Sequence, residues 1–272
     1  MGRQRIAAVL TACGALAAAL PAQGAEAQAG PWKSLFDGAS LDGWIPKIAG
    51  HPAGENYQQT FVARDGAIAV SYAGYDRFKN RFKNRFGHLF YKTPFKAYRL
   101  RLSYRFLDQG LRDTPAWARS NSGVMFHSQS PQSMELDQPF PMSVEFQALG
   151  ADGQAPRPTG AVCTPGTSVA FDGVRAKAHC ISPAAGPTIP NGTWVRLELE
   201  VLPSGEVTQK IDGVAVQHYG AVELDPADPF AAAAKGYMAA FPEPVPLTEG
   251  YIALQSEGWP IEFKDIEIQE LR

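Results

Sequence analysis

The sequence has 272 residues, of which 45% are hydrophobic and 19% are charged, and its formal net charge is −2. This nearly balanced charge argues against a nucleic-acid partner, because such partners are bound by strongly basic surfaces. The residues that follow an N-terminal leader, about 245 of them, are enough for one large domain with its own core.

Residues 1–27 predict a secretory signal peptide. Arg3 and Arg5 are followed by a 15-residue apolar run and by small residues up to Ala27, after which we expect cleavage. The run is shorter than the about 20 apolar residues of a spanning helix, so we expect no stable membrane span. Removing the leader takes away two cations and one anion, which moves the formal net charge from −2 to −3. We expect a periplasmic or secreted protein, and the segment ending at Cys13 leaves a lipid anchor as an alternative.

Most of the remaining chain predicts β-strands. Apolar and polar residues alternate over residues 98–106 and 195–201, and Asp-Gly pairs, which suit tight hairpin turns, separate such segments. Residues 206–219 predict a hairpin that turns at Asp212-Gly213, and residues 261–271 predict a last strand with a bulge at Lys264-Asp265. No sustained helical period occurs. The pattern predicts an all-β, jelly-roll-like sandwich of two antiparallel sheets in a single domain, residues 28–272.

Three regions interrupt this alternation. Residues 77–84 contain Arg-Phe-Lys-Asn twice; a duplicated surface loop is the simplest interpretation, and stacking of its aromatic rings on sugars or bases is the alternative. Residues 154–191 are rich in Pro and Gly and predict a long loop. Residues 225–249 predict a surface excursion with one helical turn near residues 230–235.

Two cysteines, Cys163 and Cys180, remain after removal of the leader, and both lie in the long loop. Because an exported chain meets an oxidising compartment, we expect them to form a disulfide. Two free thiols are the alternative. A metal site is less favoured, because His179 is the only ligand-type side chain beside the cysteines and a closed site needs about four ligands.

The polar residues in two neighbouring strand-like runs mark the candidate site. Asn121, Gly123, Met125 and His127 share one face of the first run, and Glu145 and Gln147 point away from the core in the second. If the two strands pair, these side chains form a polar wall suited to a sugar. Solvated strand residues are the structural alternative for all of them.

The C-terminal part adds a second polar and aromatic group. Gln255, Glu257 and Trp259 bring an amide, an acid and an indole to a strand end, a composition suited to stacking a pyranose ring. The alternative is a rim tryptophan that packs over the edge of the sandwich.

The sequence lacks the motifs of several common enzyme classes. The five histidines are scattered without a paired metal-ligand spacing, and neither a phosphate-binding Gly-rich loop nor a Gly-x-Ser-x-Gly motif is present. We therefore predict no metal and no cofactor. Laminarinase-type glycosidases on sandwich folds carry two catalytic carboxylates on one strand. Glu135-Leu136-Asp137 is similar to the first half of that motif, but Gln138-Pro139 follows where the second glutamate is required.

At these residues the chain resembles the 3-keto-disaccharide hydrolase domain family, also described as 3-keto-glucoside 1,2-lyase/3-keto-2-hydroxy-glucal hydratase. The resemblance covers about residues 32–271 and rests on four blocks, in chain order Leu35–Trp44, Asn121–Gly123, Glu145–Gln147 and Gly250–Gly258. In the last block many relatives have His-Gly where this chain has Glu257-Gly258. The resemblance implies a concanavalin A-like jelly roll in an exported bacterial protein that acts on 3-keto-glycosides.

For that chemistry the site needs a base, a donor to an oxyanion and an acid. We expect Glu145 to be the base, His127 or Arg119 the donor or acid, and Asn121 and Gln147 to orient sugar hydroxyls. Glu257 is an alternative acid.

A non-catalytic carbohydrate-binding module on the same sandwich is the competing function, and a structural cell-envelope protein is a third. A partly buried Glu145 that faces His127 or Arg119 in a pocket favours the enzyme, whereas an open shallow groove lined by Trp259 favours binding alone. The sequence does not predict an oligomeric state.

Overall fold

A computed structural model describes residues 1–2, 28–75 and 81–272 of the chain. Nearly all of the predicted signal peptide lies outside the described residues, as does part of the Arg-Phe-Lys-Asn tandem. None of the helices in the described part of the chain is long and apolar enough to span a membrane.

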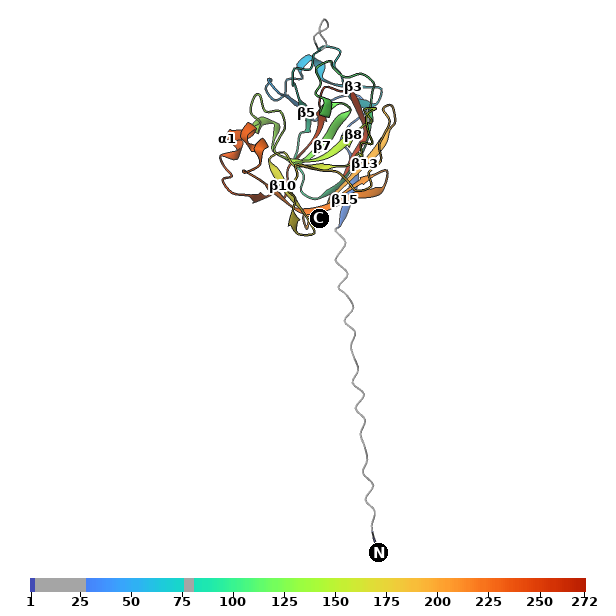
Figure 1. The fold of residues 1–272 in the computed structure, drawn as a ribbon, viewed down its shortest axis with the longest axis vertical. Helices are drawn as coiled ribbons and strands as arrows, with labels where there is room; N and C mark the ends of the chain where they lie inside the picture. The colour runs from blue at the N-terminus through green and yellow to red at the C-terminus, as the bar shows by residue number, and fades with distance from the viewer. Residues whose placement is uncertain (3–27, 76–80) are drawn as a thin grey trace.

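Two antiparallel sheets form the domain, as the alternation predicts (Figure 1). The larger sheet has eleven strands: β1 (Ala29–Ser34), β3 (Phe61–Arg64), β4 (Ala67–Val70), β6 (Tyr98–Phe106), β10 (Thr167–Phe171), β11 (Val174–Arg175), β13 (Val195–Val201), β14 (Val207–Ile211), β15 (Val214–Leu224), β16 (Val245–Pro246) and β18 (Ile261–Leu271). The smaller sheet has seven: β2 (Trp44–Ile48), β5 (Gly87–Tyr91), β7 (Asn121–Ser128), β8 (Val144–Leu149), β9 (Val162–Cys163), β12 (Cys180–Ile181) and β17 (Tyr251–Ser256).

Short helical turns occur in the connections: η1 (Tyr57–Gln59), η2 (Ala116–Ala118), η3 (Pro131–Ser133), η4 (Pro229–Ala234) and α1 (Lys235–Met238). The last two supply the helical turn predicted near residues 230–235, and α1 lies at the left margin of the molecule in Figure 1. The predicted loop 154–191 also contains the short strands β9 to β12.

The predicted strand details are confirmed in the larger sheet. Asp212 and Gly213 both have positive φ, 48° and 81°, which is the geometry of a tight hairpin between β14 and β15. The register between β18 and β6 shifts between Lys264 and Glu267, and Asp265 has a φ of 54°, so the last strand contains the predicted bulge.

The core lies between the two sheets, and this placement leaves the outer face of the smaller sheet free for a site. Val124 and Phe126 of β7 and Val144 and Phe146 of β8 are buried in the same apolar cluster as Leu100 of β6. Because successive strand residues point to opposite faces, the residues between them face outward. Segments 129–143 and 225–249 flank that outer face.

The prediction that His127 shares a face with Asn121 is wrong, because β7 bulges before it reaches His127. Tyr251 pairs with Ser128 and Ala253 pairs with Met125, so β7 has one residue more than β17 in this interval. His127 takes the positive φ of 46° that accommodates the extra residue. Its side chain therefore does not continue the alternation of Gly123 and Met125.

The described part of the aromatic segment, residues 81–86, is a loop in which Arg81, Lys83 and Asn84 are exposed, as the simplest interpretation of its sequence predicts, but its two aromatic rings are buried. Phe82 is fully buried, and its ring packs edge-on against that of Phe86 with centroids 4.9 Å apart. Asp113 accepts hydrogen bonds from the backbone amides of Phe82 and Lys83, which holds the segment against the sandwich. These rings are core residues, so they offer no surface for stacking.

The N-terminal block 35–44 is a structural element. The Trp44 indole is buried and its Nε1 donates to the Leu35 carbonyl at 2.8 Å, which closes the segment into a loop. Asp37 Oδ1 accepts from the amides of Ala39 and Ser40. This arrangement explains the sequence pattern without a role at the site.

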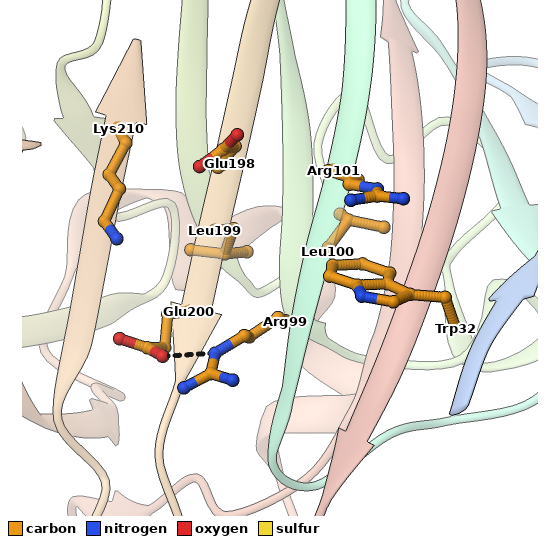
Figure 2. A pocket seen from close by; sticks show the side chains of 8 residues that line it. All are labelled: Trp32, Arg99, Leu100, Arg101, Glu198, Leu199, Glu200 and Lys210. Carbon is orange, nitrogen blue, oxygen red and sulfur yellow. Dashed lines mark hydrogen bonds and ion pairs between the residues drawn. The ribbon is translucent and has the colours of Figure 1, made fainter. Parts of the chain in front are cut away.

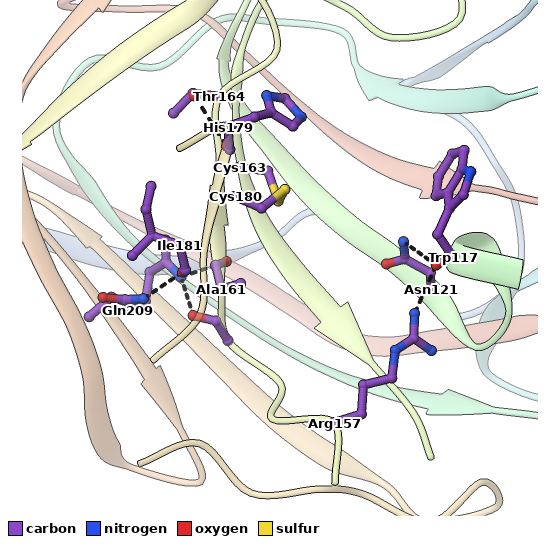
Figure 3. The surroundings of a disulfide bond; sticks show 12 residues. Trp117, Asn121, Arg157, Ala161, Cys163, Thr164, His179, Cys180, Ile181 and Gln209 are labelled. Atoms are coloured by element: carbon purple, nitrogen blue, oxygen red, sulfur yellow. Dashed lines mark hydrogen bonds between the residues drawn. A yellow bond between two sulfur atoms is a disulfide. The ribbon is translucent and has the colours of Figure 1, made fainter. Parts of the chain in front are cut away.

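The predicted disulfide is present. Cys163 of β9 pairs directly opposite Cys180 of β12, and their sulfur atoms are bonded. Figure 3 shows the bond beside His179. The cysteines are 17 residues apart, a loop length for which about 3 kcal/mol of stabilisation is expected.

Thiol titration tests this bond. Protein purified without reductant and then denatured should contain no free thiol among Cys163 and Cys180, whereas two free thiols would contradict the pairing. Replacing both cysteines with serine should lower the free energy of unfolding by about 3 kcal/mol, because the unfolded chain is then less constrained. Reduced wild-type protein serves as the matched control for this loss.

Candidate active site

Polar side chains gather on the outer face of the smaller sheet, where β7 and β8 pair. Gly123 lies opposite Gln147, and Met125 lies opposite Glu145. Asn121, Glu145 and Gln147 alternate with core residues and so share the outer face, as the sequence predicts.

Gly123 makes room for the Glu145 side chain. A Cβ at position 123 would lie 2.5 Å from Glu145 Oε1 and 2.6 Å from its Cγ, which is too close for any residue other than glycine. The carboxyl group therefore lies across β7, on the side where Gln255 of β17 is fully buried. This path across the glycine brings an amide and a carboxyl group from non-adjacent strands together.

A cavity of about 240 Å³ opens over these strands. Its polar lining comes from Asn121, Glu145, Gln147 and Glu257. The rest of its lining is largely apolar and comes from Trp117, Phe140, Cys163, Pro165, His179, Cys180 and Phe230. The cavity thus joins a carboxyl- and amide-lined part to an aromatic part.

Two buried carboxyl groups in this cavity are the most unusual feature of the site. Glu145 is 6% exposed and Glu257 is 2% exposed, and Oε1 of Glu145 and Oε2 of Glu257 have no hydrogen-bond partner among the described residues. Burial raises the pKa of Glu145 to about 8. Burial and the negative charge of Glu145 raise the pKa of Glu257 well above its ordinary value. Because two adjacent buried carboxylates repel each other, ionisation of one opposes ionisation of the other, and the pair favours holding a proton.

Nearby groups partly offset the rise in the pKa of each carboxyl group. The Gln255 amide favours the charged form of Glu145, although neither of its polar atoms makes a hydrogen bond of full geometry. The positive charge of Arg157 lowers the pKa of Glu257. Arg157 Nη2 donates to the Trp117 carbonyl at 2.8 Å, and Figure 3 shows the guanidinium reaching toward Trp117 and Asn121. Arg157 therefore also holds the segment that carries Trp117.

A row of buried polar residues continues behind Gln255 across the sheet. His88 of β5 lies directly opposite Gln255, and Lys47 of β2 lies directly opposite His88. Burial lowers the pKa of His88 to about 3, so its ring is neutral, and neither ring nitrogen has a partner among the described residues. Lys47 donates to the Leu136 carbonyl at 2.9 Å. His88 and Lys47 therefore continue the buried polar row that begins at Gln255, beside the carboxyl pair.

The structure does not bring the predicted donors His127 and Arg119 to this cavity. His127 lines a separate hollow with Lys96 and Leu247, and burial lowers its pKa to about 4. Arg119 is exposed, and its backbone carbonyl accepts a hydrogen bond from Arg157. Trp259 also lies away from the cavity, because its indole packs against the core and its Nε1 donates to the Leu107 carbonyl at 2.8 Å.

The other acidic motif lies outside the site. Glu135 and Asp137 occupy the loop after η3, where Glu135 Oε1 accepts from the Gly236 amide at 2.9 Å. However, Glu145 and Glu257 form a carboxyl pair of their own, although they come from distant parts of the chain. No sequence motif indicates this pair, because the one motif that resembles a carboxylate pair, at Glu135, lacks its second glutamate.

The aromatic residues around the cavity were not predicted as site residues. Phe230 stacks on His179 with ring centroids 4.3 Å apart, and Phe140 lies 6.0 Å from Phe230 and 6.5 Å from Trp117. They come from three separate connections, η2, segment 129–143 and η4. Their only signal in the sequence is an aromatic residue in an irregular region, which most often marks packing.

A second hollow of about 140 Å³ lies on the outer face of the larger sheet (Figure 2). Several of its charged side chains already have partners: Arg99 Nε lies 2.6 Å from Glu200 Oε1, and the Arg101 guanidinium lies 3.9 Å from the centre of the Trp32 ring. The cross-strand register places Arg99 opposite Glu200 and Arg101 opposite Glu198. We interpret this hollow as part of a ladder of charges that covers the sheet.

No three His, Cys, Asp or Glu side chains of residues 28–75 and 81–272 gather as a metal site requires.

Residues 31–269 match the model of the family described as 3-keto-alpha-glucoside-1,2-lyase-like domain. No curated protein matches the chain. Two solved structures named "putative glycosyl hydrolase", both from Parabacteroides distasonis, are 16% identical to it; the matches cover 89% of this chain and 94% and 100% of those chains, with TM-scores of 0.49 and 0.51. A carbohydrate-binding module from Bacillus subtilis is 10% identical over 83% of this chain and 94% of that one, with a TM-score of 0.42. At these identities the likeness concerns the fold.

Proposed function

Because the chain belongs to the 3-keto-alpha-glucoside-1,2-lyase-like domain family, we propose that it cleaves 3-keto-glycosides by removing the proton at C2. The observation that carries this proposal is the pair Glu145 and Glu257, buried in one cavity with raised pKa values. A pair that shares one proton supplies a base and an acid at the same time.

The first half of the proposed reaction is an elimination. A ketone at C3 acidifies the C2 hydrogen, because the resulting carbanion is delocalised onto the C3 oxygen. The Glu145 carboxylate removes that proton, and the C1–O bond breaks as a double bond forms between C1 and C2. The protonated Glu257 gives its proton to the leaving oxygen. At the end of this half Glu145 is protonated and Glu257 is ionised.

The second half is a hydration that resets both groups. Glu257 takes a proton from a water molecule whose oxygen bonds to C1. Glu145, whose proton exchanges with solvent after the leaving group has departed, returns a proton to C2. The product is the free 3-keto sugar, so the net result is hydrolysis. In this proposal Asn121 Oδ1, which has no partner among the described residues, accepts a hydrogen bond from a sugar hydroxyl, and the half-exposed Gln147 amide donates one to the C3 oxygen.

Burial of the carboxyl pair favours an enzyme over a carbohydrate-binding module. A binding platform needs aromatic faces and amides, whereas two buried carboxyl groups that repel each other destabilise the fold. Trp259, the residue on which a binding platform would depend, packs against the core instead.

Direct glycoside hydrolysis is the second candidate, and the same carboxyl pair favours it. Two carboxyl groups that flank a glycosidic bond can cleave it without a ketone. The two candidates differ in their substrates, since a carboxylate cannot remove the C2 hydrogen of an ordinary glucoside.

Paired substrates test the proposal. The purified protein should release the aglycon from a 3-keto-glucoside, while the matching glucoside without the ketone should remain intact at long incubation. Product is measured by chromatography, and the Glu145→Gln variant controls for spontaneous elimination from the 3-keto compound. Cleavage of the ordinary glucoside at a comparable rate would favour direct hydrolysis.

We also propose that the protein is exported to the periplasm or secreted. The Cys163–Cys180 disulfide supports this proposal, since such bonds persist in oxidising compartments.

A further inference from the structure

The cavity has two chemically different ends. Asn121, Glu145, Gln147 and Glu257 belong to the central strands β7 and β8 and to the segment after β17. Toward the edge strands β9 and β12, the wall consists of the Cys163–Cys180 disulfide and Pro165, with Phe140 and Phe230 beside them. With C1 and C2 of the sugar at the carboxyl pair, as the proposed function requires, the disulfide end is available for the leaving group.

The aromatic side chains of this end support one another. The rings of His179 and Phe230 are stacked, with an interplanar angle of 17°, and the ring of Phe140 meets that of Phe230 edge-on. Thr164 Oγ1 donates to the His179 carbonyl at 3.2 Å, which fixes the backbone beside the disulfide. The wall is therefore formed before a ligand binds, and this lowers the entropic cost of binding a rigid group.

Polar partners are scarce at the disulfide end. Among the described side chains that line it, His179 Nδ1 is the one buried polar atom without a hydrogen-bond partner. Burial lowers the pKa of His179, so a neutral ring faces this space. A second sugar would bring several hydroxyl groups here, and each hydroxyl buried without a partner weakens binding by about tenfold. A flat aromatic group has no such loss and gains ring contacts.

We infer that the leaving group of the substrate is a flat aromatic aglycon rather than a second sugar. This inference rests on the proposed cleavage of 3-keto-glycosides and specifies the substrate class of the same site. The aglycon ring packs against Phe140, Phe230 and the disulfide, and one polar substituent reaches His179.

Binding to the Glu145→Gln variant tests this inference without turnover. The probes are the benzyl and cyclohexylmethyl 3-keto-glucosides and a 3-keto-disaccharide, all of which have alcohol leaving groups. Titration calorimetry should give a dissociation constant for the benzyl compound about tenfold or more below that for the disaccharide. The cyclohexylmethyl compound should bind more weakly than the benzyl compound, because its ring is not flat.

A second substitution tests whether the aromatic wall of the cavity causes the preference for the benzyl compound. Phe230→Leu, added to the same variant, should remove most of the preference for the benzyl compound. Phe241→Leu is the matched control, because Phe241 packs in the same small apolar cluster as Phe230 without lining the cavity. Equal affinity for the benzyl compound and the disaccharide, or equal effects of the two Phe substitutions, would overturn the aromatic aglycon. Absence of binding by all three 3-keto compounds would overturn the proposed function itself.

Discussion

Replacing Glu145 with glutamine should lower kcat on a 3-keto-glucoside by about 10²–10⁴-fold, the usual contribution of a general base. Glutamine keeps the shape of the side chain over Gly123 and removes only its basicity. The melting temperature should stay the same or rise, because a buried amide is less costly than a buried carboxylate beside Glu257. Steady-state kinetics and a thermal melt on the same preparation measure both quantities.

The pH profile adds a second signature for Glu145. The base acts in its ionised form, and burial raises its pKa to about 8. Wild-type kcat/KM should therefore increase as the pH rises toward about 8, and Glu145→Gln should lose this dependence. Glu135→Gln is the matched control, since Glu135 is bound to the Gly236 amide outside the cavity. Unchanged kcat in Glu145→Gln with an unchanged melting temperature would move the base to another residue, first to Glu257.

Replacing Glu257 with glutamine should have an effect that depends on the leaving group. An alcohol has a pKa near that of water, about 15.7, and needs a proton as it departs, so its elimination should slow by about 10²–10⁴-fold. A phenol has a pKa near that of tyrosine, about 10, and a nitrophenol leaves more easily still. Glu257→Gln should therefore slow the 4-nitrophenyl 3-keto-glucoside far less than the benzyl compound.

Rates for both substrates with wild type and Glu257→Gln form the measurement. Glu249→Gln provides a control, because Glu249 lies at the surface in an exposed ion pair with Lys96. Equal losses on both substrates would assign Glu257 to binding or to support of Glu145 instead of proton donation. No loss on either substrate would remove Glu257 from the mechanism.

The strands could be predicted because their burial is periodic. Each residue of segments such as β6 and β13 faces either the core or the solvent, and the sequence alternates accordingly. The same alternation correctly placed Asn121 on one face of β7 and Glu145 and Gln147 on one face of β8, and the structure adds the pairing of these two strands that joins the faces. The disulfide was predictable because two cysteines remained in one loop.

The rest of the site depends on three-dimensional details that no local pattern contains. One extra residue in β7 turns His127 away, and only the register with β17 reveals it. Glu257 lies more than a hundred residues after Glu145, and their coupling arises from burial in the folded chain. Arg157 and Phe230 reach the site from irregular connections, whose course the sequence does not predict.

The fate of the C2 hydrogen tests the proposed elimination most directly. The reaction should be run in D₂O with a 3-keto-glucoside, and the released 3-keto sugar examined by NMR early in the reaction. A product incubated in D₂O without the protein, and the hydrogen at C4 of the same molecule, control for spontaneous exchange beside the ketone. Our account predicts one deuterium at C2 in each released sugar. Release of the sugar with hydrogen retained at C2 would contradict the account and support direct hydrolysis by the Glu145 and Glu257 pair.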